Sequence, residues 1–135
     1  MAESIRLEVV TPEKSVVSES AQIVMAPGSM GEFGVLSGHT PFLTTLKTGA
    51  LKYKDESGHE RFVFVSSGFA EALPDRVTVL AESAERRKDI DVQRAKSAAE
   101  RAEKRIQSGG KDVDYIRAKT ALLRAISRIQ LAETR

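Results

Sequence analysis

The chain has 135 residues, of which 41% are hydrophobic and 30% charged, a composition typical of globular proteins. It contains no cysteine, which excludes disulfides, thiolate catalysis and cysteine-ligated zinc within this sequence. No apolar run approaches the roughly 20 residues of a membrane-spanning helix, and the first residues lack the basic and apolar parts of a signal peptide. We therefore expect a chain without a transmembrane segment.

The net charge of +2 conceals a difference between the two parts of the chain. Residues 1–84 carry 7 Lys/Arg and 11 Asp/Glu, whereas residues 85–135 carry 14 and 8, so the two parts have net charges of −4 and +6. A basic segment of this kind favours an acidic partner, such as a nucleic acid, an acidic protein surface or a nucleotide. A solvated helical surface explains the charge equally well.

Residues 4–82 show the alternation of apolar and polar side chains that is typical of half-buried strands. Turn signals interrupt the alternation at residues 11–14, 55–58 and 73–76. Because no helical periodicity intervenes, the pattern favours an antiparallel β-sandwich or barrel. The predicted strands span residues 4–10, 21–26, 51–54, 61–65, 68–73 and 76–81.

After Glu82 the pattern changes to that of two amphipathic helices separated by Gly109-Gly110. We expect Asp89 to cap the first helix and Asp112 to cap the second. So short a connection predicts an antiparallel helical hairpin. The predicted organisation is thus a β-sandwich, residues 1–84, followed by an α-helical hairpin, residues 85–135. The inward-facing positions are Val92, Ala95, Ala99, Ala102 and Ile106 on the first helix, and Tyr115, Ala118, Leu122, Ala125, Ile129 and Ala132 on the second.

The inward face of the first helix consists mostly of alanine. Alanine lets two helices approach closely, but it buries little apolar area, and each Å² is worth only roughly 25 cal/mol. A weakly held helical hairpin can be released and re-docked when a partner favours the other state. A static helical appendage agrees with the same sequence.

No arrangement of residues in the sequence indicates catalysis. His39 and His59 lie far apart in turn-like segments, and no serine stands in a G-x-S-x-G element. The glycine-rich residues 28–34 lack both the Lys-Ser/Thr pair of a P-loop and the glycine spacing of a Rossmann turn. We interpret them as a tight loop that presents Glu32 to a partner. We expect no enzyme activity, no metal and no required cofactor.

Arginines recur at helical spacing in the C-terminal part. Arg94 and Arg101 are seven residues apart and Arg124 and Arg128 are four apart, so each pair shares a helix face. Asp91 stands three residues before Arg94, within reach of an ion pair. In a folded hairpin the two pairs would offer guanidinium groups to phosphates. Ordinary surface arginines are the competing interpretation.

Three motifs together resemble the epsilon subunit of F-type ATP synthases of the bacterial and chloroplast type. Their order and spacing agree with that family over the whole chain. They are Gly28-Ser29-x-Gly31-Glu32-x-Gly34 with Ser37-Gly38-His39-x-Pro41, then Ser67-Gly68-Phe69-Ala70-Glu71, and finally Ile90-Asp91-x-x-Arg94-Ala95.

The resemblance implies a ten-stranded β-sandwich, a helical hairpin and a place in the central stalk of a rotary motor. The sandwich would bind the gamma subunit and the ring of c subunits, with Gly31, Glu32 and His39 near the ring. The subunit would help to couple proton or sodium flow to rotation without catalysing a reaction. It would be peripheral to the membrane, on the cytoplasmic face of the bacterial plasma membrane.

The resemblance also implies that the helical hairpin is a brake on ATP hydrolysis. When extended, it would reach the alpha and beta subunits, where its positive charge would meet an acidic segment of beta. In some members ATP is a regulatory ligand that favours the folded hairpin. The residues of this chain at the matching positions are Glu85, Asp91, Arg94, Arg101, Arg124 and Arg128.

Two other classes of function are alternatives. A nucleic-acid-binding module would use the basic helical hairpin, but Tyr115 is its only aromatic residue, so it offers little base stacking. Nucleic acid is therefore not the expected partner. A sandwich that binds carbohydrate or another small molecule is disfavoured by the absence of tryptophan and the aromatic content of 5%.

Overall fold

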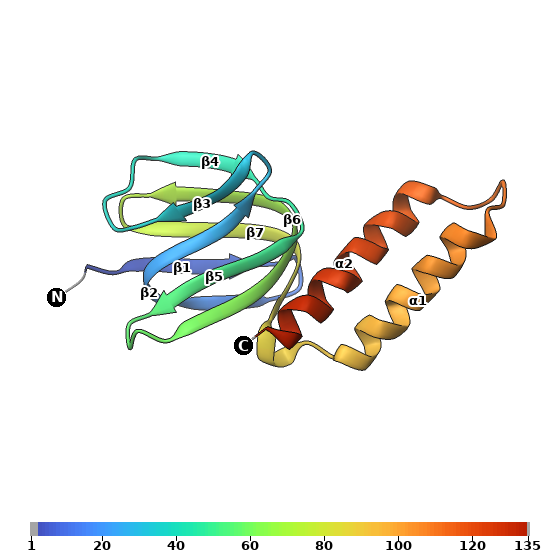
Figure 1. The fold of residues 1–135 in the computed structure, drawn as a ribbon. Coiled ribbons are helices and arrows are strands. Elements are labelled where there is room, and N and C mark those ends of the chain that lie inside the picture. Colours follow the sequence, from blue (N-terminus) through green and yellow to red (C-terminus); the bar gives the residue numbers. More distant parts are fainter. Residues whose placement is uncertain (1–2, 135) are drawn as a thin grey trace. The chain divides into compact units, whose positions relative to one another are not determined.

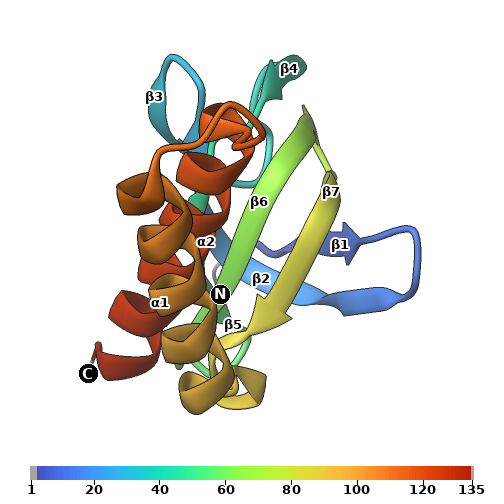
Figure 2. The ribbon, with the colours of Figure 1, turned by 90° about the vertical axis from the view of Figure 1, so that its right-hand side faces the viewer.

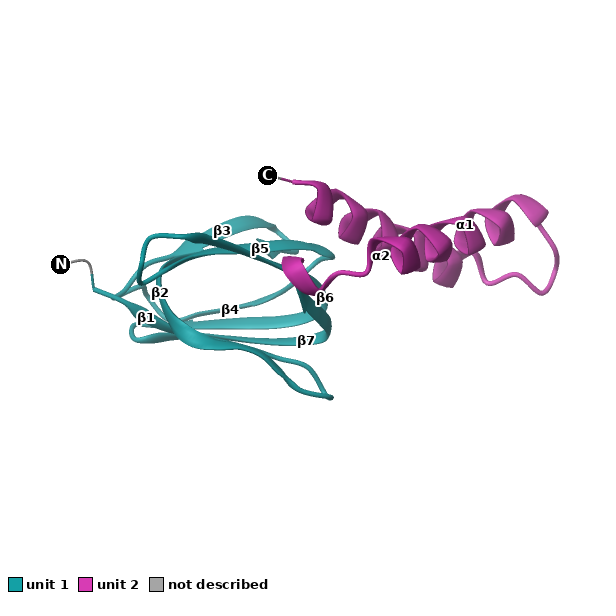
Figure 3. Ribbon diagram, turned by 90° about the horizontal axis from the view of Figure 1, so that it is seen from below, with its two compact units in different colours: residues 1–86 teal, residues 87–135 magenta. Residues whose placement is uncertain are grey.

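A computed structural model describes residues 3–134. The chain divides at residues 86 and 87 into an N-terminal β unit and a C-terminal helical unit (Figure 3). The predicted fold class, a β-sandwich followed by an α-helical hairpin, is confirmed. The β unit contains β1 (Ile5–Val10), β2 (Ser15–Gly28), β3 (Gly31–Val35), β4 (Phe42–Thr45), β5 (Gly49–Asp55), β6 (Glu60–Leu73) and β7 (Arg76–Arg86) (Figure 1). The helical unit contains a 3-10 turn, η1 (Arg87–Asp89), and the helices α1 (Val92–Ser108) and α2 (Tyr115–Glu133).

The seven strands form two layers because three of them are long enough to take part in both. In one layer β3 and β5 flank the second half of β2, and β5 pairs with the first half of β6. In the other, β4 pairs with the second half of β6, and β1 lies between β7 and the first half of β2. All pairs are antiparallel except β1 with β7. The ten strands that the resemblance implied are therefore seven continuous strands, since β2, β6 and β7 bend from layer to layer.

The bend in β6 joins two segments that the sequence predicts as separate strands, residues 61–65 and 68–73. At the bend Ser67 has φ 57° and Gly68 has φ 128°, values that favour glycine. A Cβ atom on Gly68 would lie 1.9 Å from the carbonyl oxygen of Leu80 on β7. Only glycine allows the two backbones to approach so closely, and the chain therefore continues around the bend without leaving the sheet.

The core lies between the two layers and is built from the inward positions of each strand. Leu7, Val9, Val63, Val77 and Val79 are completely buried, as the alternation predicts. Complete burial of such side chains contributes about 1.5–3 kcal/mol each. Strands β3 and β4 were not predicted, because their residues are mostly exposed and show no regular alternation.

A partly buried polar network lies where β7 ends. Tyr53 of β5 is 1% exposed and donates a hydrogen bond to the carboxylate of Glu19 on β2. Arg86 donates from Nη1 to the Tyr53 hydroxyl at 3.1 Å and from Nε to the carbonyl oxygen of Val16 at 3.0 Å. Burial, followed by the hydrogen bond to Glu19, raises the pKa of Tyr53 to about 12. The network ties the last residue of β7 to β2 and β5.

The caps of both helices lie two residues later than the sequence analysis predicted. The carboxylate of Asp91 accepts a hydrogen bond from the backbone N–H of Arg94, and that of Asp114 accepts one from Arg117, each at 3.0 Å. The predicted caps were wrong: Asp89 belongs to η1, and Asp112 precedes the cap of α2 by two residues. The chain makes one further turn before each helix, and capping requires a carboxylate next to the first helical residue. The predicted break is confirmed, since Gly109 ends α1 in the left-handed conformation.

The two helices run side by side as an antiparallel hairpin (Figure 1, Figure 2). Ala95 and Ala102 are the buried residues of α1, and Ala118 and Ala125 are their counterparts on α2, each pair seven residues apart. Leu131 is also buried near the end of α2. The predicted alanine-rich interface is thus present.

Candidate functional site

The turn between β2 and β3 exposes the residues predicted to face the rotor ring. Met30 at its tip is 97% exposed, and Glu32 is exposed on β3. Gly28 and Gly31 oppose each other across the turn, and a Cβ atom on Gly28 would lie 2.7 Å from the Gly31 carbonyl oxygen. Gly31 also has φ 133°. The glycines therefore permit a tight turn, which agrees with the interpretation of this segment from the sequence.

His39 lies in the loop between β3 and β4, beside an aromatic contact that joins these strands. The rings of Phe33 and Phe42 meet edge to face with their centroids 5.1 Å apart, and the His39 ring is 6.3 Å from that of Phe42. The Nδ1 atom of His39 lies 2.6 Å from the carbonyl oxygen of Thr40. The three predicted ring-facing residues are thus carried by β3 and the loop that follows it.

Apolar side chains form a row across the outer surface of the layer that contains β4, β6, β7 and β1. Phe69 is opposite Leu80, and Leu80 is opposite Val10, so the three point to the same face. Leu43 on β4 faces the same way, because Thr45, two residues later, is opposite Phe69. Leu43 is 68% exposed, and Phe69 and Leu80 are each 53% exposed. We call Val10, Leu43, Phe69 and Leu80 the apolar row.

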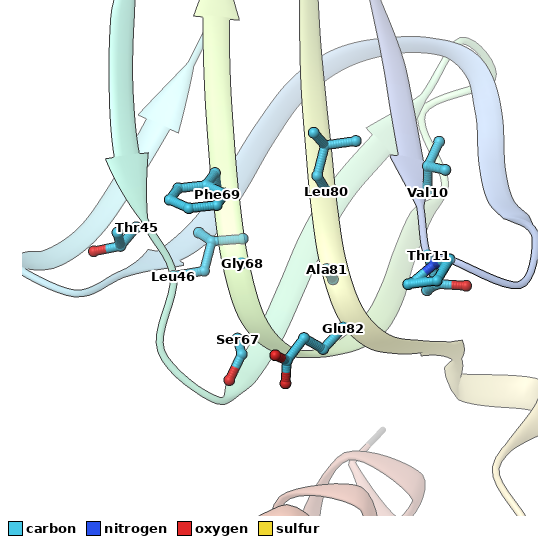
Figure 4. Close-up of a pocket in the computed structure, with 11 residues that line it drawn as sticks. Val10, Thr11, Thr45, Leu46, Ser67, Gly68, Phe69, Leu80, Ala81 and Glu82 are labelled. Carbon is cyan, nitrogen blue, oxygen red and sulfur yellow. The ribbon is translucent and has the colours of Figure 1, made fainter.

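A shallow groove beside the apolar row is lined by Leu46, Gly68 and Thr11 in addition to Phe69 and Leu80 (Figure 4). Neighbouring large apolar side chains at the surface mark contact sites for partners. No residue of this surface is among the site residues predicted from the sequence, although Gly68 and Phe69 stand in one of the three family motifs. The signal was available, since Leu80 is apolar at a position where the alternation of β7 requires a polar residue.

All six arginines of α1 and α2 project from one face of the helical hairpin. Successive residues of a helix are about 100° apart around its axis, so the residue just before an interface residue and the residue three after it project from the same side of the helix. In an antiparallel pair these positions of both helices project from the same face of the pair. Relative to the buried alanines at 95, 102, 118 and 125, every arginine of the two helices takes one of these positions. They are Arg94, Arg101 and Arg105 of α1 and Arg117, Arg124 and Arg128 of α2. We call this set the arginine face.

The lysines and glutamates of the helices lie elsewhere. Lys96, Glu103 and Lys119 each follow an interface alanine directly and therefore project from the opposite face. Guanidinium groups gathered on one surface attract anions, particularly phosphates. The two pairs of arginines singled out from the sequence thus share one surface, with Arg105 and Arg117 as additional members.

The two predicted acidic residues have different positions. Glu85 lies on β7, opposite Phe64, because the strand continues to Arg86. It belongs to the β unit, so the helical unit supplies only the other five predicted residues. The Asp91 carboxylate accepts a hydrogen bond from the backbone N–H of Arg94. Within residues 3–134, the salt bridges do not include the predicted ion pair between Asp91 and the Arg94 side chain. Asp91 therefore acts as a helix cap.

Residues 3–134 contain no group of three or more His, Cys, Asp or Glu side chains that could hold a metal ion. Within the same residues, neither helix is long and apolar enough to cross a bilayer. His59 is exposed and lies 3.8 Å from Asp55 in the β5–β6 turn, far in sequence from His39. The candidate functional residues described above lie on three surfaces: the β2–β3 turn with the His39 loop, the apolar row and the arginine face.

Two family models match the chain in succession. The one described as ATP synthase, Delta/Epsilon chain, beta-sandwich domain matches residues 4–87, and the one described as the long alpha-helix domain of the same chain matches residues 88–133. The ATP synthase epsilon chain of Desulfosudis oleivorans is 71% identical over 109 residues, which are 81% of this chain and 82% of that protein. That of Desulforapulum autotrophicum is 71% identical over 106 residues, 78% of either chain.

Solved structures agree in fold. A chain in a cryo-electron-microscopy structure of the Euglena gracilis mitochondrial ATP synthase with its c-ring has a TM-score of 0.79 and 25% identity, covering 92% of this chain and 78% of that one. A chain in the central stalk and c-ring of the Tetrahymena thermophila mitochondrial ATP synthase has a TM-score of 0.60 and 12% identity, covering 96% and 97%. The second similarity concerns the fold alone.

Proposed function

Since this chain belongs to the ATP synthase delta/epsilon chain family, we propose that it couples ion-driven rotation to ATP synthesis in the central stalk and inhibits ATP hydrolysis through its helical unit. The observation that carries the proposal is an interface of alanines between two helices whose arginines all share one face. Such an interface is weak enough to open, and the arginine face suits an anionic ligand that selects one state. The subunit acts at the cytoplasmic face of the bacterial plasma membrane, as a peripheral component.

The β unit attaches the subunit to the central stalk. We assign the apolar row to the gamma subunit, because exposed leucine and phenylalanine side chains need an apolar partner. We assign the β2–β3 turn, with Gly31 and Glu32, and the nearby His39 to the polar loops of the c ring. Replacing Leu80 by Ser should weaken binding to the isolated gamma subunit at least tenfold, a loss of about 1.4 kcal/mol. Thr78→Ser, on the same face of β7, is the control, and equal affinities of the two variants would exclude gamma from this surface.

The helical unit is the brake. Its arginine face would bind an acidic segment of the beta subunit when the helices extend toward alpha and beta. Reconstitution with alpha, beta and gamma tests this role: the full chain should slow ATP hydrolysis, and a chain truncated after Arg86 should not. The cut belongs after Arg86, because a shorter chain loses the hydrogen bonds that Arg86 makes to Tyr53 and Val16. Equal hydrolysis rates would remove the inhibitory role and leave the stalk role intact.

The same arginine face would hold ATP when the helical hairpin is closed. Arg94, Arg101, Arg124 and Arg128 would donate to the phosphates, while Asp91 fixes the first turn of α1 and thereby the position of Arg94. A ligand that binds only the closed form shifts the equilibrium by its differential affinity, so ATP would relieve inhibition.

Calorimetric titration of the isolated protein with ATP, with and without Mg²⁺, measures this affinity directly. We expect micromolar or tighter binding that Arg94→Ala and Arg124→Ala each weaken at least tenfold. Lys104→Ala is the matched control, because Lys104 follows Ala102 by two residues and points away from α2. Absence of binding up to millimolar ATP would remove the sensing role, and the brake would then depend on contacts with the motor alone.

The nucleic-acid alternative also draws on the arginine face. It lacks a stacking platform, because Tyr115 stands three residues before Ala118 and projects from the opposite side of the helical hairpin. A gel shift with single- and double-stranded oligonucleotides at about 50 mM salt distinguishes nucleic-acid binding from the proposed function. Salt-sensitive binding there, together with no effect on ATP hydrolysis in the reconstituted motor, would favour the alternative.

A further inference from the structure

Two consecutive arginines at the boundary of the units bind to different units. Arg86, the last residue of β7, donates to Val16 and Tyr53 of the β unit. Arg87, the first residue of η1, donates from Nη1 to the carbonyl oxygen of Thr134 at 3.0 Å. Thr134 follows the last residue of α2 and is separated from Arg87 by 47 positions. One side chain thus joins the beginning of the helical unit to its end.

The position of the Arg87 guanidinium suits the electrostatics of α2. The last carbonyl groups of a helix lack partners within it and form the negative end of its dipole. The last turn of α2 carries no basic residue of its own, and Glu133 adds a further negative charge there. Arg87 therefore supplies from a distant segment the cation and the donor that a helix C-terminus normally receives from its own last turn.

Thr134 is held in place to accept this hydrogen bond. Its backbone N–H donates to the carbonyl oxygen of Leu131 at 3.2 Å, and its hydroxyl donates to that of Gln130 at 2.8 Å. The caps of α1 and α2, made by Asp91 and Asp114, are by contrast local and would survive separation of the helices. The hydrogen bond from Arg87 to Thr134 cannot survive it, because its two ends belong to different elements.

We propose that Arg87 is a latch that holds the end of α2 against η1 and thereby favours the closed helical hairpin. Its role adds to that of the alanine interface, which offers little apolar area to resist opening. The latch concerns the helical unit by itself. Its regulatory consequence, that losing it strengthens inhibition of ATP hydrolysis, rests on the proposed function.

Amide hydrogen exchange of the isolated full chain, followed by NMR, tests the latch. Exchange of a protected amide reports how often its segment opens. A cation at a helix C-terminus changes stability by an amount that corresponds to about a two- to fivefold change in an opening equilibrium. We expect Arg87→Ala to accelerate exchange of Leu131, Ala132 and Thr134 by this factor, and Arg87→Lys, which keeps the charge, to accelerate it less than twofold.

Lys88→Ala is the matched control, since Lys88 is an exposed cation one residue along η1. It should leave the exchange of the α2 end unchanged. Equal effects of Arg87→Ala and Lys88→Ala would overturn the latch, and so would an acceleration spread evenly over both helices. The measurement uses neither the motor nor ATP, so its outcome is independent of whether the proposed brake operates.

Discussion

Gly68 provides a sharp test of how closely β6 and β7 approach at the bend. A Cβ atom there would lie 1.9 Å from the Leu80 carbonyl oxygen and 2.9 Å from the Ala81 Cα atom. Both contacts are with backbone, so no side-chain rotation relieves them. Gly68→Ala must therefore push the strands apart, in addition to forcing alanine into a backbone conformation with φ 128°.

Gly58 in the β5–β6 turn supplies the comparison. It also has a positive φ, 86°, but a Cβ atom on it would meet nothing within 4 Å. Unfavourable φ alone costs about 1–3 kcal/mol, and overpacking adds typically about 1–3 kcal/mol. Because both variants carry the cost of φ, we expect overpacking to make Gly68→Ala lower the free energy of unfolding by about 1–3 kcal/mol more than Gly58→Ala does.

Urea denaturation followed by tyrosine fluorescence measures the difference. The chain has two tyrosines and no tryptophan, so in a Tyr115→Phe background the signal comes from Tyr53 in the core of the β unit. With a slope of about 1 kcal/mol per M for a unit of this size, the urea midpoint for Gly68→Ala should lie about 1–3 M below that for Gly58→Ala. Equal midpoints would refute the reasoning, because they would mean that the space beside Gly68 is open.

Three further predictions concern single residues. The pKa of Tyr53 is raised from 10 to about 12 in the folded protein, so its contribution to stability is complete below pH 10 and falls by up to about 3 kcal/mol as the pH rises to 12. The tyrosinate absorbance of the Tyr115→Phe variant measures the pKa of Tyr53, and titration near pH 10 would contradict the prediction. Asp91→Ala should destabilise α1 by about 1 kcal/mol. Asp91→Asn should not, because it keeps a capping oxygen, and neither should Asp89→Ala. Equal losses of helical circular dichroism on heating in all three variants would refute Asp91 as the cap. Ala125→Leu should overpack the helix interface and lower the stability of the helical unit by about 1–3 kcal/mol. Lys119→Leu, on the exposed surface of α2, should leave that stability unchanged. Thermal melting followed by helical circular dichroism compares the two variants, and an unchanged melting temperature for Ala125→Leu would contradict the close approach of the helices.

Several parts of the structure follow from local sequence signals. Alternation located β1, β5 and β7, and the apolar stripes at helical spacing located the interface of the helices, because burial on one side imposes a period on each element. Gly109 indicated the end of α1, because glycine readily adopts the left-handed conformation in which helices end. The caps were misplaced by two residues because several acidic residues stand near each helix start, and only the backbone path decides which of them reaches an N–H group.

The sequence by itself determined the two-part organisation, the alanine interface and the clustering of positive charge in the second part, all of which depend on periodicity and composition. Tertiary structure alone decided which residues from distant segments meet. The apolar row joins Val10, Phe69 and Leu80 through strand register, and the contact of Arg87 with Thr134 spans 47 positions. The partly buried network of Tyr53 and Arg86 arises in the same way. Such contacts depend on which segments pair and in which register across the whole unit, so the pattern within a single segment does not reveal them.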